Sequence, residues 1–138
     1  MKLAAVFPGQ GSQSPGMLAD LAAQYKVVEE TFAEASEELG YDLWDMAQNG
    51  TAEQQRQTEI TQPLMFAGGI SVWRIWQELN MPAPSFVAGH SLGELCADRI
   101  RCDRFCQCNK TCSAARQADG FSCRTRCWWY GSAVGYGR

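Results

Sequence analysis

The stretch Gly89-His90-Ser91-Leu92-Gly93 decides the fold, and a short apolar run, Ser85-Phe86-Val87-Ala88, leads into it. The pentapeptide has the G-x-S-x-G pattern of a nucleophile elbow, in which a strand turns sharply into a helix and presents a serine at the tip. The two glycines permit the tight turn because a β-carbon there would collide with neighbouring backbone. An ordinary Gly/Ser turn has the same composition, so the surrounding chain has to distinguish a catalytic turn from a structural one.

The segment before this pattern predicts a long buried helix. Thr61 is a suitable N-cap, and Pro63 sits near the first turn, where its missing N–H costs nothing. From Leu64 to Leu79 nearly every position is apolar, so we expect the helix to be largely buried. The pair Gly68-Gly69 suggests close contact with another backbone segment.

Shorter helices are predicted further towards the N-terminus. Over residues 26–39 apolar side chains recur at helical spacing, with glutamates mostly on the other face and Gly40 at the end. We interpret those glutamates as a solvated face. Residues 42–46 predict a further short helix, and the polar residues 51–60 predict a loop with one helical turn.

The beginning of the chain reads as a strand followed by a flexible loop. The apolar run Leu3–Phe7 is typical of a strand buried on both faces of a parallel sheet. The loop Gly9-Gln10-Gly11-Ser12-Gln13 follows it, at the end of a strand where α/β sheets bind ligands. It is neither a P-loop nor a complete dinucleotide fingerprint. Together these elements predict an α/β fold.

Charge and cysteine content divide the chain near residue 95. Residues 1–94 carry a net charge of −8 and no cysteine, whereas residues 95–138 carry a net charge of +5 and all seven cysteines. No targeting segment is visible, and no stretch approaches the length of a membrane span. We therefore expect a cytoplasmic protein, with neither a membrane nor a nucleic acid as its partner.

Four motifs in order carry a resemblance to a known family. The first is residues 6–13, the second is Pro15-Gly16-Met17, the third is Ile60-Thr61-Gln62-Pro63, and the fourth is Ala88-Gly89-His90-Ser91-Leu92-Gly93-Glu94. These motifs resemble the malonyl-CoA:acyl carrier protein transacylases of fatty acid biosynthesis, in the free-standing bacterial form. The resemblance covers residues 1–94. It implies that they form the N-terminal part of an α/β-hydrolase-like acyltransferase core.

The resemblance also implies a reaction and its residues. Ser91 would attack the thioester of malonyl-CoA and hold the malonyl group as an ester, from which the pantetheine thiol of acyl carrier protein takes it. The backbone N–H groups of Leu92 and Gln10 would form the oxyanion hole. No metal and no cofactor are implied, because malonyl-CoA is the substrate.

One part of the catalytic machinery does not appear in this sequence. The family places a histidine roughly a hundred residues beyond its serine as the general base, and this chain has a single histidine, His90. Adjacent side chains at an elbow point in different directions, so His90 is a poor base for Ser91. We therefore expect no measurable transacylase activity from these 138 residues.

Residues 95–138 do not continue the family pattern. The x₃ spacings between Cys102 and Cys106, Cys108 and Cys112, and Cys123 and Cys127 match no common zinc site. A disulfide module would need a secreted context and usually an even cysteine count. When residues 95–120 are back-translated and read one base later, permitted codons give a continuation that resembles the family. We interpret 95–138 as an out-of-frame tail with irregular or disordered structure and no domain.

Two other functions are compatible with parts of the sequence. A serine esterase or thioesterase would use the same elbow, although the Gly-Gln-Gly-Ser-Gln loop has no counterpart in that pattern. A small cysteine-rich binding protein centred on the tail would be no enzyme at all. Transfer to a carrier thiol would indicate the transacylase, and hydrolysis would indicate the esterase or thioesterase. Stoichiometric zinc in the purified protein would indicate the binding protein.

Overall fold

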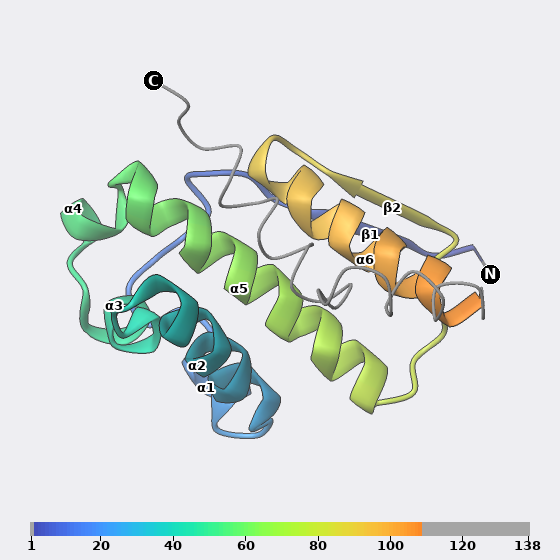
Figure 1. The fold of residues 1–138 in the computed structure, drawn as a ribbon, viewed down its shortest axis with the longest axis horizontal. Coiled ribbons are helices and arrows are strands. Elements are labelled where there is room, and N and C mark those ends of the chain that lie inside the picture. The colour runs from blue at the N-terminus through green and yellow to red at the C-terminus, as the bar shows by residue number, and fades with distance from the viewer. Residues whose placement is uncertain (1, 109–138) are drawn as a thin grey trace, which may run out of the picture. The chain divides into compact units, whose positions relative to one another are not determined.

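The computed structural model describes residues 2–108, with side chains as far as residue 100. The elements found there are, in chain order (Figure 1), Ala4–Phe7 (β1), Ala19–Ala22 (α1), Val27–Leu39 (α2), Leu43–Asn49 (α3), Ala52–Gln55 (α4), Thr58–Glu78 (α5), Phe86–Gly89 (β2) and Leu92–Cys108 (α6). The chain divides into a first unit, residues 1–97, and a second, residues 98–138, so that α6 begins in one and ends in the other. This order confirms the predicted α/β class.

Strands β1 and β2 pair in parallel, with Ala4 opposite Phe86 and Phe7 opposite Gly89. One face of the pair is covered, because Phe7 and Val87 are buried. On the other face Val6 is 72% exposed and Phe86 is 62% exposed. The prediction of a first strand buried on both faces is therefore wrong for the described residues, since a helix covers only one face of this two-stranded sheet.

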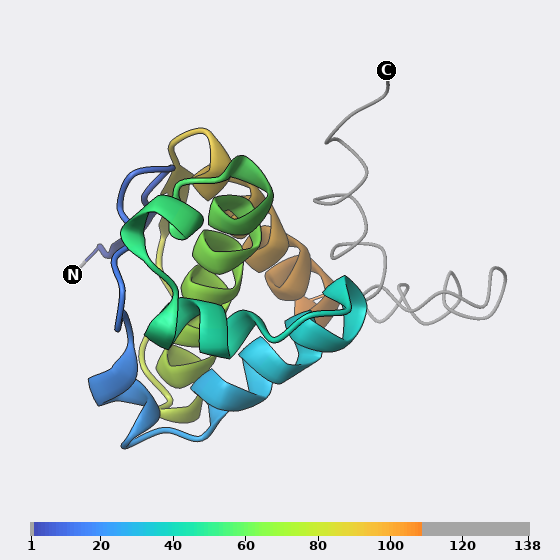
Figure 2. The same ribbon diagram turned by 90° about the vertical axis from the view of Figure 1, so that its left-hand side faces the viewer.

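Helix α5 lies between the strands and the other N-terminal helices (Figures 1 and 2). It begins at Thr58, earlier than the predicted start at Thr61. The Thr61 hydroxyl is buried and donates to the carbonyl of Gln55 instead of capping the helix. This contact links the end of α4 to the first turn of α5, and the cap pattern at Thr61 did not indicate it.

The glycine pair in α5 contacts side chains, not the backbone segment that the sequence suggested. A β-carbon on Gly69 would lie 2.8 Å from Sγ of Cys96 and 3.3 Å from a ring carbon of Phe7. A β-carbon on Gly68 would lie 3.0 Å from the methyl group of Met17. The missing side chain at Gly69 therefore lets α5 approach β1 and the start of α6.

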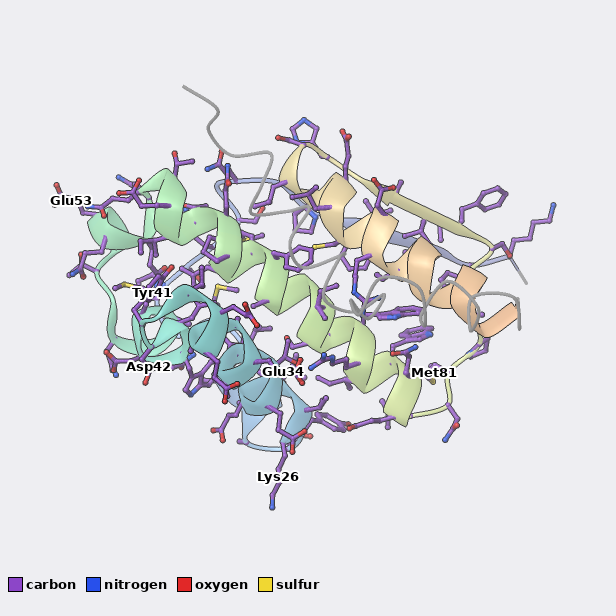
Figure 3. All side chains as sticks on the ribbon, in the orientation of Figure 1. Lys26, Glu34, Tyr41, Asp42, Glu53 and Met81 are labelled. Atoms are coloured by element: carbon purple, nitrogen blue, oxygen red, sulfur yellow. The ribbon has the colours of Figure 1, made fainter. Side chains whose placement is uncertain are left out.

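Helices α2 and α3 agree with their predicted positions. Gly40 ends α2 with φ +76°, and the Asp42 carboxylate caps α3 by accepting the Asp45 N–H at 2.8 Å (Figure 3). The glutamates of α2 are exposed, and Glu34 forms a 2.7 Å ion pair with Arg74 of α5. Most of this face is therefore solvated, as predicted, with one bridge to the neighbouring helix.

Helix α6 extends to Cys108, into the region predicted to be irregular. Residues 94–108 contain neither proline nor glycine, so nothing in their local sequence stops a helix that the elbow has started. The rest of that region, residues 109–138, lies outside the described residues. Among the described residues, no helix is both long and apolar enough to span a membrane.

Candidate active site

Ser91 lies at the tip of a sharp turn between β2 and α6. Its φ is +52°, a value that side-chain-bearing residues rarely adopt, and the residue is exposed. The turn is closed by two hydrogen bonds: the Gly93 N–H donates to the His90 carbonyl at 3.0 Å, and the Glu94 N–H donates to the Ser91 carbonyl at 2.9 Å. Such a left-handed serine between a strand and a helix is the geometry of a nucleophile elbow.

Both glycines of the pattern are required by close backbone contacts. A β-carbon on Gly89 would overlap the carbonyl group of Gly93, and a β-carbon on Gly93 would overlap the carbonyl oxygen of Phe7. The first contact lies within the elbow, and the second brings the start of α6 against the end of β1. The G-x-S-x-G pattern is therefore explained here by the packing of the turn.

The elbow and the Gly-rich loop touch each other. The His90 N–H donates to the Phe7 carbonyl at 3.1 Å, which joins the end of β2 to the end of β1. A β-carbon on Gly9 would lie 2.8 Å from the His90 carbonyl oxygen and 2.9 Å from His90 Nδ1. The two stretches singled out by the sequence thus meet at Gly9 and His90.

The amides predicted as oxyanion donors flank this contact. Gln10 follows Gly9, and Leu92 is the first residue of α6. Among the hydrogen bonds of the described residues, neither amide acts as a donor. The amide of Leu92 also lies at a helix N-terminus, where the backbone dipoles favour negative charge. Both N–H groups therefore lack an internal acceptor among the described residues, as an oxyanion donor requires.

The side chain of Gln13 and the backbone carbonyl of Gln55, neither singled out individually by the sequence, support the Gly-rich loop. Gly11 has φ +97°, and its N–H donates to Oε1 of Gln13 at 2.9 Å. Nε2 of Gln13 donates in turn to the carbonyl of Gln55 at 3.3 Å. Gln13 was part of a recognised motif, but Gln55 lies in a stretch predicted only as a polar loop, so no sequence signal indicated the pair.

The neighbouring thiol of Cys96 does not compete with Ser91 as a nucleophile. Burial raises the pKa of Cys96 to about 12, so the thiol stays protonated near neutral pH. Among the residues with described side chains, no group of three or more potential metal ligands comes together. Ser91, which is exposed, is therefore the candidate nucleophile at this junction, whereas the Cys96 side chain is buried.

Comparison with known proteins places this site in a family. The family model of the acyl transferase domain matches residues 5–103, which extends past the last motif residue, Glu94. The chain therefore belongs to the acyl transferase domain family. Within that family, the relatives described next are malonyl-CoA acyl carrier protein transacylases.

The curated relatives include the malonyl CoA-acyl carrier protein transacylases of Salmonella typhimurium and Escherichia coli K12. Each is 55% identical over 96 residues, which is 70% of this chain and 31% of the relative. The present chain thus spans about a third of the length of the curated relatives that it matches.

Solved structures agree with this assignment. An acyl carrier protein S-malonyltransferase from Vibrio cholerae is 59% identical with a TM-score of 0.69, and the match covers 70% of this chain and 32% of that one. A malonyl-transacylase solved in complex with a type II polyketide synthase acyl-carrier protein is 57% identical with a TM-score of 0.69, over 70% of this chain and 31% of that one. The observed fold is therefore that of these enzymes over the matched part.

Proposed function

We propose that this site serves the transfer of a malonyl group from malonyl-CoA to the pantetheine thiol of acyl carrier protein. The observation that carries the proposal is Ser91 at φ +52°, exposed at the tip of the elbow, with the unbonded amide of Leu92 directly after it. The curated relatives of this chain described above are malonyl CoA-acyl carrier protein transacylases. In this proposal malonyl-CoA and acyl carrier protein are the partners, and no metal or cofactor takes part.

The reaction proceeds in two displacements at Ser91. The serine oxygen attacks the thioester carbonyl, the C–S bond breaks, and CoA leaves as the thiol after accepting the proton that the serine loses. The carrier thiol then attacks the serine ester and restores the hydroxyl. In both steps the carbonyl oxygen becomes an oxyanion, and in this proposal the amides of Leu92 and Gln10 donate to it. A donor of this kind typically contributes about 3 kcal/mol to the transition state.

The proton transfers need a base that this junction does not supply. His90 is the single histidine of the sequence, and its ring nitrogen Nδ1 lies beside Gly9 of the Gly-rich loop. We therefore expect the 138 residues to hold the nucleophile and the oxyanion donors without efficient activation of the serine. When one member of a catalytic triad is removed, roughly 10³–10⁴-fold catalysis over water persists from the oxyanion hole and substrate binding. We thus expect slow acylation of Ser91 and no measurable turnover.

Chemical rescue tests this proposal. The chain is incubated with malonyl-CoA and acyl carrier protein bearing its pantetheine arm, with and without free imidazole as an external base, and malonyl-carrier protein is measured by mass spectrometry. We expect no measurable product without imidazole and slow, imidazole-dependent transfer with it. Ser91→Ala should abolish the rescued transfer and leave the fold intact.

Two results would count against the proposal. Release of free malonate in place of malonyl-carrier protein would favour a serine esterase or thioesterase. Turnover without imidazole at the level of full-length relatives would contradict the absence of a working base. We also propose a cytoplasmic location, where acyl carrier protein and malonyl-CoA are both present; fractionation of cells that produce the chain tests this location.

A further inference from the structure

We propose that Gln13 and Gln55 act as positioning residues that hold the Gly-rich loop so that the amide of Gln10 meets the oxyanion formed at Ser91. This inference rests on the function proposed above. It assigns a role to two glutamines, one of them far from the elbow in sequence, that act through the loop and do not touch the substrate.

Beyond Gly9, which packs against His90, the Gly-rich loop has few other contacts. Between Pro8 and Gln13 the described residues show no backbone-to-backbone hydrogen bond outside the strand. Gly11 has no neighbour within 4 Å of the place where a β-carbon would be, so no packing confines the loop there. On its N-terminal side the loop is held where Gly9 packs against His90. Beyond Gln10, the restraint is the hydrogen bond from the Gly11 N–H to Oε1 of Gln13, at 2.9 Å.

The Gln13 side chain also binds a backbone carbonyl outside the loop. Its Nε2 donates to the Gln55 carbonyl at 3.3 Å, across 42 residues of sequence. The same carbonyl accepts the hydroxyl of Thr61, which is buried in α5. The Gln13 side chain thus joins two parts of the molecule. Its amide oxygen holds the loop, and its amide nitrogen binds the corner between α4 and α5.

Gln55 itself is held firmly. It is 1% exposed, and its Nε2 donates to the carbonyls of Met46 at 2.9 Å and Ala47 at 3.1 Å. The Ala47 carbonyl also accepts the N–H of Gly16 at 3.0 Å, three residues beyond the C-terminal end of the loop. Both ends of the segment from Gln13 to Gly16 are therefore anchored to the last turn of α3, directly or through Gln55.

Rigid placement matters for an oxyanion donor because its contribution depends on being in position before the charge develops. Loss of one such donor costs about 10²–10³-fold in rate. A loosened donor still reaches the oxyanion part of the time, so we expect a smaller loss, on the order of tenfold, when the tether is cut. Binding of malonyl-CoA should change little, because neither glutamine touches it in this proposal.

The test compares Gln13→Met with Gln48→Met. Methionine keeps the length of glutamine but removes its hydrogen-bonding amide. Gln48 is a matched control because its Nε2 also donates to a distant carbonyl, that of Met17 at 2.9 Å, which lies beyond the anchored end of the loop. The measured quantity is the rate of Ser91 acylation by malonyl-CoA in imidazole, over a range of malonyl-CoA concentrations.

We expect Gln13→Met to lower the limiting acylation rate about tenfold at an unchanged half-saturating concentration, and Gln48→Met to leave both unchanged. Gln13→Glu should resemble Gln13→Met in rate, because a carboxylate can accept the Gly11 N–H but cannot donate to the Gln55 carbonyl. An unchanged limiting rate in Gln13→Met, or an equal loss in Gln48→Met, would overturn the proposal.

A second measurement separates this proposal from the proposed function. Nuclear magnetic relaxation of the Gln10 and Gly11 amides reports loop order without any reaction. We expect lower order parameters in Gln13→Met than in the unaltered chain and in Gln48→Met. If the unaltered chain fails to acylate Ser91, the proposed function fails, and equal order parameters in all three proteins would then overturn the tether as well.

Discussion

Residues 89–93 and residues 9–13 meet at the ends of β2 and β1, but Gly11 of the loop serves a different purpose from the two glycines of the elbow. In the elbow, β-carbons on Gly89 and Gly93 would overlap neighbouring carbonyl groups. In the Gly-rich loop, Gly11 has open space around it and is required only by its φ of +97°. The elbow is thus held by close packing of backbone, and the part of the loop beyond Gly9 by side-chain hydrogen bonds.

This difference means that the two proposed oxyanion donors would be held rigid by separate means. The amide of Leu92 is fixed because it starts a helix whose next residue, Gly93, packs against Phe7. The amide of Gln10 depends on Gln13 and on the distant Gln55. Substitutions should therefore damage the two loops to different extents and in different ways.

Gly93→Ala should have the largest effect. Its β-carbon would overlap the Phe7 carbonyl oxygen, so β1 and α6 have to move apart. We expect a loss of about 3 kcal/mol in the free energy of unfolding, at the upper end for an overpacked site. Denaturant unfolding followed by circular dichroism measures it. A loss below about 1 kcal/mol would contradict the close packing of the elbow.

Gly11→Ala should cost less. Space is available for the methyl group, and the penalty comes from a backbone conformation that alanine rarely adopts. We expect a loss of about 1 kcal/mol, measured in the same unfolding experiment. If Gly11→Ala destabilises the chain as strongly as Gly93→Ala, the distinction between the two loops fails.

Ser91→Gly should have the smallest effect on stability, and a favourable one. Glycine relieves about 1–2 kcal/mol of left-handed strain at φ +52°, but it costs about 0.5–1 kcal/mol of extra unfolded-chain entropy. The expected gain is about 0.5 kcal/mol relative to Ser91→Ala, with acylation abolished in both. A less stable Ser91→Gly would show that the turn is unstrained in solution.

Local patterns predicted much of the fold. The apolar period of residues 26–39 with Gly40 at its end corresponds to α2, Val27–Leu39, because both signals act within one or two turns. The start of α5 and the bare face of β1 were not predicted. The first depends on the contact between Thr61 and Gln55, and the second depends on which elements cover the sheet around Val6.

The candidate site was predictable to a similar degree. The turn at Ser91 and the nearby Gly-rich loop follow from short motifs, whose glycines are forced by backbone geometry. The tether from Gln13 to Gln55 joins residues 42 positions apart, and nothing in either local sequence indicates it. The roles of Gln10 and Leu92 as oxyanion donors stay predictions until the reaction is measured.

Mapping the acylated residue tests the central claim most directly. The chain is incubated with malonyl-CoA and imidazole, treated with neutral hydroxylamine to remove malonyl groups from cysteine thiols, digested, and analysed by mass spectrometry. We predict one malonyl group on the peptide that contains Ser91, and none in Ser91→Ala. Malonylation of a different residue, or equal labelling of Ser91→Ala, would contradict Ser91 as the nucleophile.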